Sequence, residues 1–352
     1  MLTQSIWPLS NERYERYSAP APIKRQLAAL RPDNFTGFCY IAKDYLVIIL
    51  AAIATTRVSW ALYPLALLFI GAHQRSLTTI AHDTAHRTLA RSKWLNYALG
   101  ILFAAYPLFQ RHWAYRISHV YRHHRFLGDP HHDPDLRFFL KAGVYDVCPP
   151  RQYFWRIVLR PILGGASVSY LKYLWGNRFV VGVQADGSDR TAVLVDKVGF
   201  AAFWITVVAV TIALGHFLDL VLFWVVPYLT TFQILGWFIE LAEHSPMCET
   251  ERVDALLTRN RKGNFLERIF FGQNLDEYHL EHHLSPGVPF WRLREAQRIR
   301  LQDPRYVAVA ATWGGLFVSG PKGQKSVIAQ LLERNERLYT QSLEAAKAAE
   351  AP

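Results

Sequence analysis

Two long apolar blocks restrict what this chain can fold into more than any other feature. The first runs from about Tyr40 to Ile80 and the second from Val198 to about Leu241. Each block is long enough for two membrane crossings, because one crossing helix needs roughly 20 apolar residues. Polar residues interrupt the first block at 55–59, and a Gly-His pair at 215–216 interrupts the second. Both blocks are therefore predicted to form helical hairpins.

The predicted fold class is an all-α membrane protein with four transmembrane helices in two hairpins. The composition agrees with this fold, because only 19% of the residues are charged and 51% are hydrophobic, whereas soluble domains average about 25% charged residues. The predicted crossings lie at about residues 40–56, 60–80, 198–214 and 218–241. The predicted organisation is a polar N-terminal segment at 1–39, a membrane domain at 40–293 and a C-terminal segment at 294–352, which ends in a soluble helix from about 326 to 348.

Two further apolar stretches, 94–109 and 157–175, are predicted to be interfacial or re-entrant helices. The first is short for a crossing, and the second is interrupted by Arg160, Pro161 and Lys172.

The orientation of the chain follows from its basic residues. The connection from 74 to 197 carries seventeen Lys and Arg, and the two opposite turns carry essentially Arg57 alone. Because basic loops stay on the cytoplasmic side, the long connection is predicted to be cytoplasmic.

The net charge of +11 is consistent with a basic cytoplasmic face of a membrane protein. The sequence contains no zinc-finger spacing and no RNA-binding aromatic pattern. Acidic lipid headgroups or an acidic electron-transfer protein are therefore the predicted partners, and nucleic acid is not.

The histidines carry most of the chemical information. Nine of the fourteen fall into three clusters and one isolated position. These are His82 with His86; His119 with His123 and His124; His279 with His282 and His283; and His244 alone. Histidines three or four residues apart lie on one face of a helix. On the predicted topology all nine emerge on the cytoplasmic side, provided that 94–109 does not cross.

Nine imidazoles exceed what one tetrahedral metal ion can use, so two metal ions are the simplest interpretation. Imidazole binds zinc, copper, iron and nickel, and these residue types do not choose among them. A single histidine is more often structural than a ligand, but three clusters on one membrane face favour a metal centre.

The three boxes, HxxxH, HxxxHH and HxxHH, interleaved with two hydrophobic hairpins, resemble the membrane fatty-acid desaturase superfamily, which also includes lipid hydroxylases and carotenoid ketolases. The resemblance covers roughly 44–293 and includes the stretch from Glu243 through Asn274 to the third box. It implies a pair of irons that activate O2 to abstract hydrogen from an unactivated C–H bond. The implied iron ligands are His82, His86, His119, His123, His124, His244, His279, His282 and His283.

The resemblance leaves some details open. Some family members have an Asn one turn before the isolated histidine, where this chain has Glu240. Ligating histidines usually donate their second ring N–H to a carboxylate or a carbonyl. The carboxylates close enough in sequence for this role are Asp83, Asp276, Glu277 and Glu281. Each of them could equally be a solvated surface charge.

The other histidines are weaker candidates. His131 and His132 lie in a Pro-rich turn after the second box, and His216 lies at the turn on the opposite side of the membrane. His73 is predicted to be structural, and the sequence suggests no role for His112.

The predicted activity is O2-dependent desaturation of a fatty acyl chain, lipid-linked or carrier-linked. The sequence has no His-Pro-Gly-Gly haem segment and no CxxxxCxxC ferredoxin pattern, so an external ferredoxin or cytochrome b5-like protein would supply the electrons.

The alternative is a hydroxylase or ketolase of a lipid, carotenoid or specialised metabolite. More distant alternatives are a metal transporter, which would line a path through the bilayer with its histidines, and a zinc hydrolase, for which no HExxH motif exists. The predicted location is a bacterial cytoplasmic membrane, with the active site facing the cytoplasm.

Overall fold

The computed structural model describes residues 17–180, 190–247, 257–309 and 313–350, and these residues form helices and connecting loops without any strand. The helices of the first half are α1 (Ala21–Ala28), α2 (Thr36–Ile53), α3 (Tyr63–His86), α4 (Lys93–Gly100), α5 (His112–Arg116), α6 (Pro134–Lys141), α7 (Pro150–Phe154), α8 (Arg160–Ile162) and α9 (Ser167–Trp175). Those of the second half are α10 (Arg190–Ala213), α11 (Phe217–Leu220), α12 (Val226–Leu229), α13 (Thr231–His244), α14 (Phe265–Phe271), α15 (His279–Leu284), α16 (Leu293–Arg300), α17 (Pro304–Val309) and α18 (Val327–Glu350).

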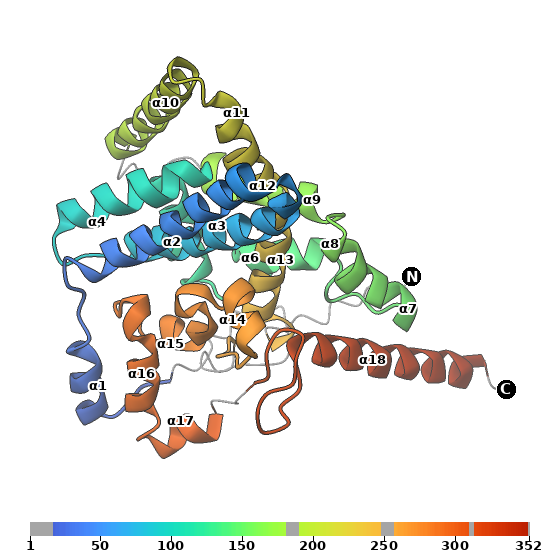
Figure 1. Ribbon diagram of the computed structural model, residues 1–352. Helices are drawn as coiled ribbons and strands as arrows, with labels where there is room; N and C mark the ends of the chain where they lie inside the picture. The colour runs from blue at the N-terminus through green and yellow to red at the C-terminus, as the bar shows by residue number, and fades with distance from the viewer. Residues whose placement is uncertain (1–16, 181–189, 248–256, 310–312, 351–352) are drawn as a thin grey trace.

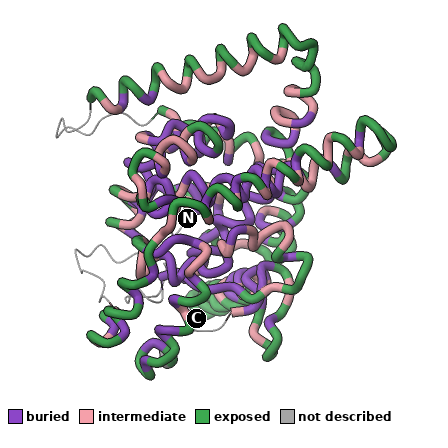
Figure 2. The backbone as a smooth tube through the Cα atoms, turned by 60° about the vertical axis from the view of Figure 1, so that its left-hand side comes forward, coloured by how far each residue is buried: buried purple, intermediate pink, exposed green. Residues whose placement is uncertain are grey.

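Three helical segments of the described chain are long and apolar enough to cross a membrane. They are Thr36–Val58, which is α2 with a π-helical turn at its end; Arg190–Ala213, which is α10; and Phe217–His244, which joins α11, α12 and α13. These segments match the predicted first, third and fourth crossings. Burial is lowest along α10, which stands apart at the top of the molecule (Figures 1 and 2), and is higher in the third segment because most of α13 is buried. Exposed apolar surface of this extent is expected of a helix that faces lipid.

The predicted second crossing corresponds to α3, which differs from the other three. It is 24 residues long, but every residue from Ile70 to Ala81 is buried. The helix lies between α2 and α13 (Figure 1). Its polar side chains have partners inside the protein: Gln74 donates to the carbonyl of Trp224 at 2.8 Å, and Ser76 donates to Asp44 at 2.9 Å. These polar residues lower the hydropathy of α3. A buried helix can carry them because they form hydrogen bonds inside the protein.

Close packing holds α3 in this position. A side chain at Gly71 would collide with Thr231, at the start of α13. The hydroxyl of Thr231 donates to the carbonyl of Leu67 on α3 at 2.6 Å. The first turns of α3 are therefore fixed against the start of α13, and both helices finish with histidines.

The stretches predicted to be interfacial do not form long helices. Residues 94–109 consist of α4 and two short irregular helical turns, with Trp94, Leu102 and Phe103 exposed. Residues 157–175 are broken between α8 and α9 by Gly164, whose φ of 80° ends the helix. Below the bundle, α14, α15, α16 and α17 form a second layer, and α18 extends away from it, occupying the region where a soluble helix was predicted (Figure 1).

Candidate metal centre

All nine histidines of the predicted set come together beneath the bundle. They form two groups whose candidate ligand atoms lie within 4.8 Å of one another in each group. The first group is His82, His86, His119, His124 and His282, and the second is His123, His244, His279 and His283. Each group is buried or half-buried. Five and four nitrogen donors are enough to hold one metal ion each.

Four segments of the chain supply these side chains. His82 and His86 lie one turn apart near the end of α3, and His244 is the last residue of α13. The second cluster sits at the π-helical turn Ile117–His123 that follows α5, and the third is on α15. The two groups adjoin, because His124 and His283 stack with their ring centroids 4.3 Å apart.

Three histidines are oriented by a bond to their Nδ1 atom. The Nδ1 of His123 lies 2.9 Å from Asp133, that of His82 lies 3.3 Å from Asp83, and that of His244 donates to the carbonyl of Leu257 at 3.0 Å. A carbonyl can only accept, so the proton of His244 is on Nδ1 and its Nε2 carries a lone pair. This is the arrangement usual for metal-ligating histidines.

Within each group, Nε2 atoms face one another. His282 and His124 approach to 3.0 Å, and His279 and His244 approach to 3.1 Å. The buried Nε2 atoms of His82 and His86 have no hydrogen-bond partner among the described residues. Buried polar atoms without partners are costly, and lone pairs converging at 3 Å repel unless a cation lies between them. The donor set therefore fits metal binding.

The protonation of three of the rings fits metal binding, whereas that of His123 differs. Burial, reinforced by neighbouring histidines, holds the pKa of His119, His124 and His279 well below its usual value, so these rings stay neutral as ligands must. Burial also lowers the pKa of His123, but the carboxylates of Asp133 and Asp135 outweigh burial and raise it to about 9.

The orienting residues Asp133 and Leu257 were not predicted from the sequence. Asp133 belongs to the Pro-rich turn that contains His131 and His132, and its carboxylate also accepts from the first backbone N–H groups of α6. An Asp directly before a Pro is a recognisable helix start, but nothing in the sequence brings it back to His123. Leu257 acts through its backbone carbonyl, which no side-chain pattern can reveal.

Of the four carboxylates suggested for orienting a histidine, Asp83 is the one that bonds to a histidine ring. It contacts His82 and also accepts from the backbone N–H of Phe290 at 2.9 Å. Glu277 pairs with Arg268, and Glu281 is held by Arg300 and Tyr306.

Asp276 is paired with Arg261 at 2.8 Å. Its carboxylate nevertheless lies in one group with Glu243 and His279, in which the candidate ligand atoms are within 4.8 Å of one another. Asp276 therefore belongs with the charged residues beside the histidines, although no hydrogen bond joins it to a ring.

The remaining histidines lie away from the two groups. His132 is exposed and bonds to Asp129 at 3.0 Å, and its neighbour His131 is exposed too. His216 is exposed beside Asp219 at the far end of α10. His73 is buried and bonds to Asp44 at 2.8 Å, in agreement with the structural role predicted for it.

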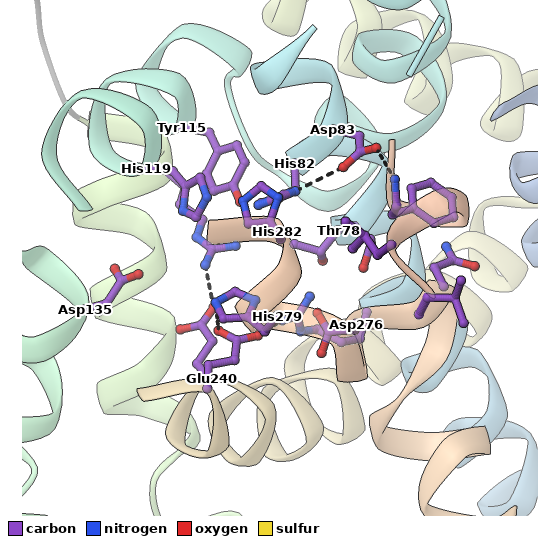
Figure 3. Close-up of a pocket in the computed structure, with 18 residues that line it drawn as sticks. Thr78, His82, Asp83, Tyr115, His119, Asp135, Glu240, Asp276, His279 and His282 are labelled. Carbon is purple, nitrogen blue, oxygen red and sulfur yellow. Dashed lines mark hydrogen bonds and ion pairs between the residues drawn. The ribbon is translucent and has the colours of Figure 1, made fainter. Parts of the chain in front are cut away.

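A cavity opens directly beside the histidines, and His82, His119, His279 and His282 form part of its wall (Figure 3). Its empty volume, including the solvent at its mouth, is about 550 Å³. Apart from four hydrocarbon or aromatic side chains, the wall is polar or charged. Glu240 takes part in it and is paired with Arg178, which approaches from the end of α9.

Comparison with known proteins identifies the class of protein. The family model described as fatty acid desaturase matches residues 58–313, which contain all nine histidines. The chain belongs to the fatty acid desaturase family.

Individual relatives differ in the substrates that their names give. A protein named dihydrorhizobitoxine desaturase, from Bradyrhizobium elkanii, is 65% identical over 337 residues, which are 96% of this chain and 96% of that protein. An sn-1 oleoyl-lipid 12-desaturase from Anabaena variabilis is 24% identical over 72% of this chain and 71% of its own length. An sn-1 acyl-lipid omega-3 desaturase (ferredoxin) from Nostoc is 31% identical over 29% of this chain and 28% of its own length. The chain is thus similar to desaturases of two kinds, and it is an oxidoreductase of the desaturase type.

Proposed function

We propose that this protein is a di-iron, O2-dependent desaturase in which His82, His86, His119, His124 and His282 hold one iron and His123, His244, His279 and His283 hold the other. The convergence of nine imidazoles into two adjoining buried groups supports this assignment most strongly. Two irons bound there would supply the oxidising power, drawn from O2 and two electrons, that removes hydrogen from an unactivated C–H bond.

The residues of the chain prepare this chemistry. Asp133 and Leu257 hold His123 and His244 in the tautomer that turns Nε2 inward. The burial of the rings keeps water away from the oxidising centre. In the balanced reaction, the substrate loses two hydrogens from neighbouring carbons, and these hydrogens, two electrons and two protons reduce one O2 to two water molecules.

We propose further that the substrate is a small polar metabolite, of which dihydrorhizobitoxine is the first to test. The similarity to the Bradyrhizobium elkanii protein extends over nearly the whole chain. The cavity beside the histidines supports the same choice, because most of the residues that line it are charged or polar. An acyl chain would leave the unpaired polar atoms of this wall, such as Nε of Arg75, without water, at a cost of about 1–3 kcal/mol for each.

The second candidate is the fatty acyl chain predicted from the sequence. Similarity to the oleoyl-lipid desaturases and the exposed apolar helices favour it. Hydroxylation or ketolation of the same substrate would need the same metal centre and is distinguished by product mass.

We propose four membrane crossings, with α3 as the crossing that is shielded from lipid by α2 and α13. The seventeen Lys and Arg between 74 and 197 support a cytoplasmic histidine centre in a bacterial cytoplasmic membrane. An external ferredoxin or cytochrome b5-like protein would then bring electrons from that side, as the name of the Nostoc relative suggests for that protein.

Labelling in spheroplasts tests this orientation. A Cys introduced by His216→Cys should react with a membrane-impermeant maleimide, and one introduced by Lys141→Cys should not.

The activity test uses the purified, iron-loaded protein with O2, ferredoxin, its reductase and NADPH. Dihydrorhizobitoxine and an oleoyl lipid are offered in parallel, and products are measured by mass spectrometry. The expected result is a product that has lost two hydrogens from dihydrorhizobitoxine and an unchanged oleoyl lipid. Turnover of the oleoyl lipid alone would contradict the polar substrate, and a product that gained one oxygen would contradict desaturation.

A further inference from the structure

The cavity beside the histidines has a wall unlike that of an apolar channel. Leu275, Phe290, Leu293 and the ring of Tyr115 provide its hydrocarbon surface. The other lining residues are His, Thr, Asn, Arg, Asp and Glu (Figure 3). These polar groups come from α3, the π-helical turn after α5, α6, the π-helical turn after α9, α13, and α15 with the segment before it, so the fold itself assembles them.

The cavity is lined by charged groups of both signs. Arg75 and Arg178 line it on the positive side, and Glu240, Glu243 and Asp276 on the negative side. Arg178 pairs with Glu240, and Asp276 pairs with an arginine behind the wall, Arg261. An occupant of the cavity therefore meets charged groups of both signs.

Two more carboxylates line the cavity but already have roles at the histidines. Asp83 contacts His82 and the backbone of Phe290. Asp135 accepts from Tyr173 and lies 3.3 Å from His123. Neither is therefore free to bind a substrate.

Arg75 is the cation of this set whose bonding is incomplete. Its side chain is 9% exposed, and its nearest ion pair, to Glu243, is long at 3.7 Å. Its buried Nε has no hydrogen-bond partner among the described residues. A guanidinium binds a carboxylate through parallel N–H donors, so a carboxylate in the cavity would complete its bonding.

Acceptor atoms converge next to Arg75. Glu243, Asp276 and His279 place candidate ligand atoms within 4.8 Å of one another. An ammonium group has three donors and no acceptor, which matches a site of this kind. Because Arg75 and Glu243 lie only 3.7 Å apart, the site suits a carboxylate and an ammonium on the same carbon.

We infer that this cavity recognises the α-amino acid head of a zwitterionic substrate, with its carboxylate on Arg75 and its ammonium on Glu243 and Asp276. The inference rests on the proposed small polar substrate and names its chemical class. Glu243 directly precedes His244, and His279 lies 3.6 Å from Glu243. The head group is thereby anchored at one edge of the metal centre, and the rest of the substrate extends towards His82 and His282.

Binding measurements on the iron-loaded, full-length protein test this inference without turnover. The probes are norleucine, hexanoate and pentylamine, which carry both charged groups, only the carboxylate and only the ammonium. Isothermal titration should give norleucine the highest affinity. Arg75→Met should weaken norleucine and hexanoate by about 10- to 100-fold, as expected for the loss of a charge-assisted hydrogen bond, and should leave pentylamine unchanged. Arg75→Lys should recover part of the loss.

Two further variants separate a binding role from a general defect. Asp276→Asn should weaken norleucine and pentylamine but spare hexanoate. Arg268→Met changes an arginine that is half exposed and paired outside the cavity, and it should bind all three probes as the unmodified protein does. Iron content and melting temperature are measured for each variant, so that misfolded protein is excluded from the comparison.

Three results would overturn the inference: equal affinity of norleucine and hexanoate, an unchanged norleucine affinity in Arg75→Met, or binding of an additional divalent metal at Glu243 and Asp276 with no binding of norleucine. The proposed function can fail separately. If norleucine binding depends on Arg75 but dihydrorhizobitoxine is not turned over, the named substrate is contradicted and the head-group site remains supported.

Discussion

The two 24-residue helices α3 and α10 use the same length for opposite purposes. In α10 only Val193 and Asp196 are buried, and most of its other side chains are apolar and exposed. In α3 a continuous run of twelve residues from Ile70 to Ala81 is buried, and it includes Arg75 and several hydroxyl and amide side chains. By hydropathy, α10 is apolar enough to cross a membrane and α3 is not, because polar residues that face the protein interior lower the hydropathy of α3.

The largest expected effect contrasts the histidines at the ends of these helices. His86→Ala removes a ligand of the first group and should abolish both the bound iron of that group and the activity. His216→Ala, at the exposed end of α10, should leave iron content and activity unchanged. Metal analysis and product assays of both variants check this. Retention of full iron content by His86→Ala would contradict the ligand assignment.

The next effect concerns stability. Ile70 is fully buried on α3, whereas Ile205 on α10 is 69% exposed. Ile70→Ala should cost about 2–5 kcal/mol of unfolding free energy, and Ile205→Ala less than about 0.5 kcal/mol. Unfolding in detergent, followed by circular dichroism, measures the difference. Equal losses would mean that α3 is less enclosed than its burial indicates.

A smaller effect distinguishes two Asp–His pairs of similar geometry. Asp133 contacts buried His123 at 2.9 Å, and Asp129 contacts exposed His132 at 3.0 Å. Asp133→Asn should weaken iron binding by about 10- to 100-fold, as expected when the partner of a ligating histidine is changed. Asp129→Asn should have no effect, because solvent already satisfies both groups. Competition with a chelator measures the affinities, and similar values for the two variants would contradict the role of Asp133.

Much of this arrangement was predictable because local spacing encodes it. Histidines three and four residues apart must share a helix face, and apolar runs of about 20 residues must find lipid or a core. The grouping was not predictable: His123 joins His244, His279 and His283 and separates from its neighbour His124, because adjacent residues on a helix point in different directions. Likewise, Asp133 reaches His123 only because the chain turns back after the second box.

The polar cavity was also beyond the sequence. Arg75 stands within an apolar block and could have been a charge near a helix end, and Glu240 appeared only as a departure from a family pattern. Their common location depends on how α3 and α13 pack. Local patterns therefore predicted which histidines come together, whereas tertiary contacts assembled the cavity beside them.

Metal content of the detergent-purified protein tests the central claim most directly. The unmodified protein should contain about two irons per chain, and the double variant His123→Ala, His282→Ala, which removes one ligand from each group, should lose both while keeping its helical circular dichroism. Zinc in place of iron, or the same iron content in a folded double variant, would contradict the di-iron centre.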